Sequence, residues 1–160
     1  MGYYTEMRVA TTKEGWAHAK ERAEEIYCAL LQDKLDKAAK VKTQNNGEYV
    51  EWNNDGSSAW NSARTSLPKN IFNKCGEAEV TVNGKTKQYV MYGFSWLKWV
   101  GYEHMERRAW EMAWEEIEEP VYTIAVGEDG VTEENEYGED YDMPYIETGG
   151  FSYSDEWKLS

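Results

Sequence analysis

The longest regular pattern of hydrophobic and polar residues lies between residues 11 and 40. Apolar residues recur there at intervals of three to five positions, which is typical of one face of an α-helix. Thr11 and Glu14 stand three residues apart, the spacing of a capping box, so we expect the helix to begin here. The apolar stripe consists of Trp16, Ala19, Ala23, Ile26, Tyr27, Leu30 and Leu35.

A second helical pattern covers residues 102–119 and ends before Pro120, which cannot continue a helix. Its polar side is strongly acidic. Its apolar side contains Tyr102, Met105, Ala109, Met112, Ala113 and Ile117, and it is widened by Trp110 and Trp114. The sequence therefore predicts two amphipathic helices.

Four other segments have the patterns of β-strands. Residues 3–10 alternate loosely, and residues 78–93 predict a hairpin whose turn is Asn83-Gly84, because both residues tolerate positive φ. Residues 121–126 form a short apolar run that suits a buried strand. Residues 151–157 alternate and predict a last edge strand. Between the helices, residues 43–66 are rich in turn formers, with a brief strand expected at 48–52 and a short helix at 60–67.

These patterns predict an α+β fold with two amphipathic helices packed on a small, mostly antiparallel sheet. A chain of 160 residues is long enough for one domain with a true core, and we expect a single domain over residues 1–160. The acidic C-terminal segment contains Gly and Pro punctuation and few apolar residues. We therefore expect residues 128–148 to be a mobile acidic loop.

Charge is distributed very unevenly along the chain. Residues 109–157 contain sixteen Asp or Glu residues and no Lys or Arg, whereas the rest has fourteen acids and seventeen bases. The formal net charge of -13 therefore arises from this one stretch. An excess of this kind repels nucleic acids and anionic membranes and attracts basic partners.

Chemical motifs are absent from the sequence. It has no nucleophile elbow, phosphate-binding loop, dinucleotide fingerprint or zinc-ligand spacing, and its two histidines are too few for most acid-base schemes. We therefore expect no enzymatic activity, no cofactor and no metal. The two cysteines, Cys28 and Cys75, do not make a disulfide framework, and we expect neither a leader nor a membrane-spanning segment. We read both thiols as reduced and the protein as cytoplasmic, in the host cell if it is phage-encoded.

The acidic stretch gives the leading functional hypothesis. Its carboxylates are interleaved with tyrosines, so it suits an arginine- and lysine-rich cleft, with aromatic anchors and electrostatic steering. In size, acidity and aromatic content the chain is similar to the DNA-mimic inhibitors that phages and mobile elements use against host defence, such as anti-CRISPR and anti-restriction proteins. The expected partner is a basic nucleic-acid-binding protein such as a nuclease. The residues predicted to contact it are Glu115, Glu116, Glu118, Glu119, Glu133, Glu134, Glu136, Tyr137, Glu139, Asp140, Tyr141 and Asp142.

Two alternatives stay open from the sequence. Trp96, Trp99, Trp110 and Trp114 suit an aromatic pocket of a module that binds or sequesters a small ligand, although the same pattern is also typical of core packing. Dense carboxylates also permit, without specifying, an enzyme that uses them as acid and base or to hold Mg²⁺.

Overall fold

The computed structural model describes residues 4–44, 71–98, 105–147 and 152–160. The strand expected at 48–52 and the helix expected at 60–67 lie outside these residues. The fold is α+β, with a six-stranded antiparallel sheet in the order β5-β4-β1-β3-β2-β8. These strands are β1 (Tyr4–Thr12), β2 (Asn73–Val82), β3 (Lys85–Lys98), β4 (Val121–Gly127), β5 (Thr132–Tyr137) and β8 (Trp157–Leu159).

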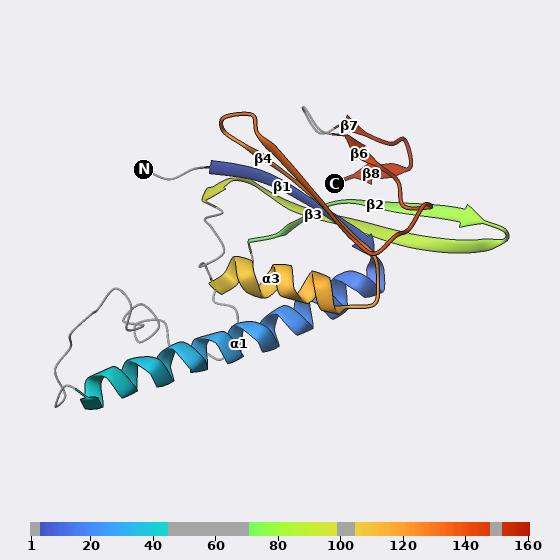
Figure 1. Cartoon of the computed structure of the whole chain (residues 1–160). Helices are drawn as coiled ribbons and strands as arrows, with labels where there is room; N and C mark the ends of the chain where they lie inside the picture. Colours follow the sequence, from blue (N-terminus) through green and yellow to red (C-terminus); the bar gives the residue numbers. More distant parts are fainter. Residues whose placement is uncertain (1–3, 45–70, 99–104, 148–151) are drawn as a thin grey trace.

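The described residues contain two helices, α1 (Lys13–Gln44) and α3 (Met105–Glu116), and both cover the same face of the sheet (Figure 1). A two-stranded sheet of β6 (Ile146–Glu147) and β7 (Ser152–Tyr153) lies on the other side. The sheet is therefore covered on both faces, although the second covering is thin.

Strand alternation gives each face its own core. Val9 of β1 packs into the helix-side core, whereas its neighbour Ala10 packs into the core under β6–β8, and both are fully buried. β1 lies between β3 and β4, with Val9 opposite Tyr92 on one side and Thr123 on the other. This central position explains why most of β1 is buried, polar Thr5 and Thr11 included.

The helix-side core is dominated by aromatic rings. Trp16 stacks on Tyr92 with ring centroids 3.9 Å apart and lies 5.2 Å from Trp110. Where α1 and α3 meet, the completely buried residues are alanines, which allow two helices to approach closely. They are Ala19, Ala23, Ala109 and Ala113.

The start of α1 differs slightly from the prediction. β1 runs directly into the helix, and the hydroxyl that caps it is that of Thr12, which accepts a hydrogen bond from Gly15 N at 2.9 Å. Thr11 still belongs to the strand, and its hydroxyl donates to the carbonyl of Pro120 at 2.8 Å. The predicted capping box of Thr11 and Glu14 is therefore wrong by one residue.

Most of the predicted strands are confirmed, and two of them are longer than expected. β2 and β3 form the hairpin around Asn83 (φ 53°) and Gly84 (φ 77°), with Val82 opposite Lys85. The predicted C-terminal strand is divided between β7 and β8, and β8 is one of the two edges of the sheet.

The loop expected over residues 128–148 is wrong at two places, because β5 and the short strand β6 both lie within it. Residues 132–137 form β5, which pairs with β4 from Val121↔Tyr137 to Val126↔Thr132. The turn between the strands is held by backbone bonds from Gly127 N to Val131 O and from Gly130 N to Gly127 O, each 2.9 Å. β4 is buried and needs a hydrogen-bonding partner on its outer side, so an acidic segment becomes a strand despite its low propensity.

Candidate functional site

The main exposed acidic feature is the outer edge of the sheet. β5 is the last strand on its side, and its four middle residues, Glu133 to Glu136, are all exposed. The turn before it and the loop after it continue the pattern. We call this feature the acidic edge and define it by the exposed carboxylates of Glu128, Asp129, Glu133, Glu134, Glu136 and Glu139.

Alternation directs the acidic edge to both faces of the sheet. Glu133 lies on the helix side, where its carboxylate is 3.6 Å from the guanidinium of Arg107 in α3. Glu134 lies on the opposite face and accepts a hydrogen bond from the Tyr122 hydroxyl at 2.8 Å. Burial and this carboxylate raise the pKa of Tyr122, so its hydroxyl stays a donor.

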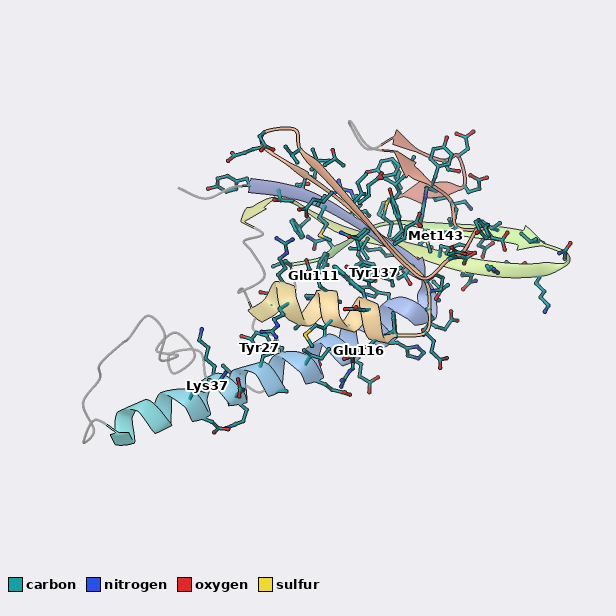
Figure 2. The ribbon with its side chains drawn as sticks, viewed as in Figure 1. Tyr27, Lys37, Glu111, Glu116, Tyr137 and Met143 are labelled. Atoms are coloured by element: carbon teal, nitrogen blue, oxygen red, sulfur yellow. The ribbon has the colours of Figure 1, made fainter. Side chains whose placement is uncertain are left out.

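Two of the four predicted acids at and just after the end of α3 contact the other helix rather than β5. Glu116 pairs with Arg22 of α1, and Glu119 lies 2.5 Å from Nδ1 of His18. Glu115 and Glu118 are exposed, and no cation pairs with either among the described residues. Figure 2 shows Glu116 on the side of α3 that faces α1.

Asp140 and Asp142 hold the loop after β5 onto the sheet. The Asp140 carboxylate accepts from the Tyr89 hydroxyl at 2.7 Å and from its own chain at Asp142 N at 3.0 Å. Lys87 contacts both acids, at 3.4 Å and 2.9 Å. The side chain of Asp140 is only 9% exposed. Most of its surface is therefore already covered by contacts within the protein and is not accessible to a partner.

The two predicted tyrosine anchors lie in different environments. The Tyr137 ring is half-buried against Trp114, with centroids 6.2 Å apart, on the helix side of the sheet (Figure 2). Tyr141 is 92% exposed, and its hydroxyl donates to Glu139 at 3.1 Å. Only Tyr141 has the accessibility that an anchor requires.

A cleft of about 300 Å³ opens between the loop at 138–146 and the open end of the β4–β5 hairpin, where β4 begins and β5 ends. Met143 and Ile146 line it, and both also pack on the core away from the helices; Figure 2 shows Met143 on the side of the sheet opposite Tyr137. Tyr122, Glu136, Tyr141 and Tyr145 also line it. The sequence gives no sign of this cleft, because one of its walls follows β5, a strand that the residue pattern does not predict.

The tryptophan pocket is not supported at the two positions that the structure describes in full. Trp110 and Trp114 are each 1% exposed and belong to the helix-side core. Trp99 lies outside the described residues. Core packing, the other interpretation of this pattern, is therefore confirmed for Trp110 and Trp114.

Within the described ranges, no group of three or more His, Cys, Asp or Glu side chains is placed to hold a metal ion. Cys28 and Cys75 are both free thiols, and burial raises the pKa of Cys75. Among the described residues, no helix is both long enough and apolar enough to cross a membrane. No protein family, curated protein or solved structure matches the chain.

Proposed function

We propose that this protein is a binding protein that occludes a basic nucleic-acid-binding cleft of its partner, in the manner of DNA-mimic inhibitors of host defence. The observation that carries the proposal is the acidic edge. Its six carboxylates are exposed along one strand and its flanking turns, in a stretch of sequence without Lys or Arg.

The spacing of these charges is compatible with the pattern that a nucleic-acid-binding cleft recognises. Successive residues of an antiparallel strand advance by ~3.4 Å. Phosphates along one strand of B-DNA also advance by ~3.4 Å of helix axis. Glu133, Glu134 and Glu136 fall within four consecutive residues of β5, so the strand offers charge at a similar axial density.

The predicted contact residues differ in how strongly they are already paired within the protein, and therefore in how readily a partner can bind them. Glu136 and Glu139 make no ion pair among the described residues, so a partner's cation gains contacts there without breaking any ion pair. Glu133 has a long and exposed contact with Arg107, which a better-placed arginine can replace. Asp140 is different, because breaking its bonds releases the loop that it holds.

The proposal is tested by capture of partners from a host lysate at low salt and at ~0.5 M salt, where screening is severe. Wild-type protein is compared with a variant in which Glu133, Glu134, Glu136 and Glu139 are replaced by Gln. The expected result is a basic nucleic-acid-binding protein that is retained at low salt, weakened at high salt, displaced by duplex DNA and lost with the variant.

A matched control changes the same number of exposed acids on α1. These residues are Glu21, Glu25, Asp33 and Asp36, each replaced by its amide. This control has the same net charge as the edge variant and should retain the partner. Equal loss of the partner in both variants would reduce the effect to overall charge, and retention in both would contradict the proposal.

A further inference from the structure

The cleft beside the acidic edge has an aromatic rim whose rings are left in solvent. Tyr141 is 92% exposed and Tyr145 is 59% exposed, and both line the cleft. Large aromatic residues contribute to stability mainly through burial, so two exposed rings at one opening add little to the fold. They are instead available to a ligand.

The charged groups of the cleft are all negative. Glu136, Glu139 and Asp140 line it, and no Lys, Arg or His is among its lining residues. Asp140 is already bonded to Tyr89 and Lys87. Glu136 is exposed, and Glu139 accepts only a neutral hydroxyl, that of Tyr141, among the described residues. The cleft thus has two carboxylates whose charge no described cation neutralises.

The apolar part of the cleft selects for a cation on a hydrocarbon stem. Met143, Pro144 and Ile146 line it together with the tyrosines. A simple metal ion gains nothing from such a wall. The volume of the cleft, about 300 Å³, is at the lower end of the range for small-molecule sites. A cleft of this size suits one side chain better than a large ligand.

We propose that this cleft receives an arginine side chain of the protein partner, with the guanidinium against Tyr141 and Tyr145 and paired with Glu136 and Glu139. A guanidinium is planar, stacks on aromatic rings and can pair with a carboxylate through two parallel hydrogen bonds. Lysine offers a more strongly hydrated point charge without this stacking. The inference rests on the proposed function for its partner, and it adds the residue type that the partner inserts.

The test is a titration of the ¹⁵N-labelled protein with N-acetyl-arginine amide, followed by NMR. The probes for comparison are N-acetyl-lysine amide and N-acetyl-citrulline amide, which has nearly the same shape as the arginine probe but no charge. We expect saturable shifts confined to the cleft, strongest with arginine, weaker with lysine and absent with citrulline. Equal shifts with citrulline, or shifts spread over all exposed carboxylates, would overturn the inference.

Variants make the test specific to the cleft. Replacing Glu136 and Glu139 by Gln should weaken arginine binding by at least about fivefold, and Tyr141→Ala should also weaken it. The control replaces Glu21 and Glu25 by Gln, because both are exposed acids on α1 and neither lines the cleft. This control should bind arginine as the wild type does, and equal weakening would refute the assignment.

The two proposals fail in distinguishable ways. If the arginine probe does not bind but the edge variant still loses a DNA-competed partner, the cleft inference is wrong and the occlusion function stands. If the probe binds in the cleft but no basic nucleic-acid-binding partner is captured, the cleft is an arginine site and the proposed function is wrong.

Discussion

Asp140 is the residue whose role is most sharply defined by the structure, and Asp140→Ala is the most informative stability test. Its carboxylate accepts from the Tyr89 hydroxyl at 2.7 Å, and Tyr89 is only 1% exposed. The substitution leaves a buried hydroxyl without its acceptor, which costs about 2 kcal/mol. The Lys87 contact adds little, because its ammonium group is exposed and screened by solvent.

In a domain of this size, a loss of about 2 kcal/mol lowers the Tm by about 4–8 °C. Urea unfolding followed by tryptophan fluorescence measures the change directly, since the core tryptophans report the loss of packing. Glu139→Ala is the matched control from the same loop, because Glu139 is exposed, and it should alter stability by less than about 0.5 kcal/mol.

A double-mutant cycle decides whether the effect belongs to the Tyr89–Asp140 bond. In the Tyr89→Phe background no hydroxyl is left unpaired, so Asp140→Ala should cost about 1–2 kcal/mol less than in the wild type. Additivity within about 0.5 kcal/mol would refute the reasoning, as would equal stability of the Asp140→Ala and Glu139→Ala variants.

Three further outcomes are expected. Burial and Asp140 raise the pKa of Tyr89 above its ordinary value of 10.0, so the native state holds this proton more tightly than the unfolded chain. The free energy of unfolding should therefore fall as the pH rises above about 10, by up to ~1.4 kcal/mol per pH unit, and urea titrations of Tyr89→Phe should show a smaller slope. Trp114→Ala should destabilise the fold by about 3–5 kcal/mol in the same assay, and a loss below 1 kcal/mol would contradict its core position. Gly15→Ala gains about 1 kcal/mol of helix propensity, but its new Cβ would lie 2.3 Å from Thr11 Oγ1, which is hydrogen-bonded to the carbonyl of Pro120. Calorimetry should therefore show a lower stability than that of the wild type. A stabilised variant would disprove the clash.

The helices and the hairpin could be predicted because their signals are local. The stripe through Trp16 and Ile26 has the helical period, and Asn83-Gly84 specifies a two-residue turn at positive φ. β4 was also predictable, because its apolar run is short and bounded by Pro120. In each case the information lies within about twenty residues of the element itself.

β5 could not be predicted from its own residues, because its three Glu and one Asn, which are depleted in strands, outnumber Thr132 and Tyr137. The sequence from Thr132 to Tyr137 has one aromatic residue and three glutamates, and it becomes a strand through pairing with β4. Glutamates disfavour a strand by their intrinsic propensity, but they suit an edge strand. Charged side chains there discourage pairing with the edge of another molecule.

The ion pairs of the acidic residues could not be predicted from the sequence either. Glu116 and Arg22 are 94 positions apart, and Asp142 and Lys87 are 55 apart. A count of charges treats all these acids alike, whereas the fold separates those that tie elements together from those that face solvent. The cleft depends on the same distinction, because Asp140 positions the loop that forms one of its walls.

The central place of β1 has a consequence for how the chain is made. β1 precedes both of its neighbours in the chain, since β3 begins at Lys85 and β4 begins only at Val121. At ~5–20 residues per second, β1 waits roughly 5–20 s for its second neighbour. Because β1 pairs only with strands that are distant in sequence, folding should be slower than that of a helical protein of this length.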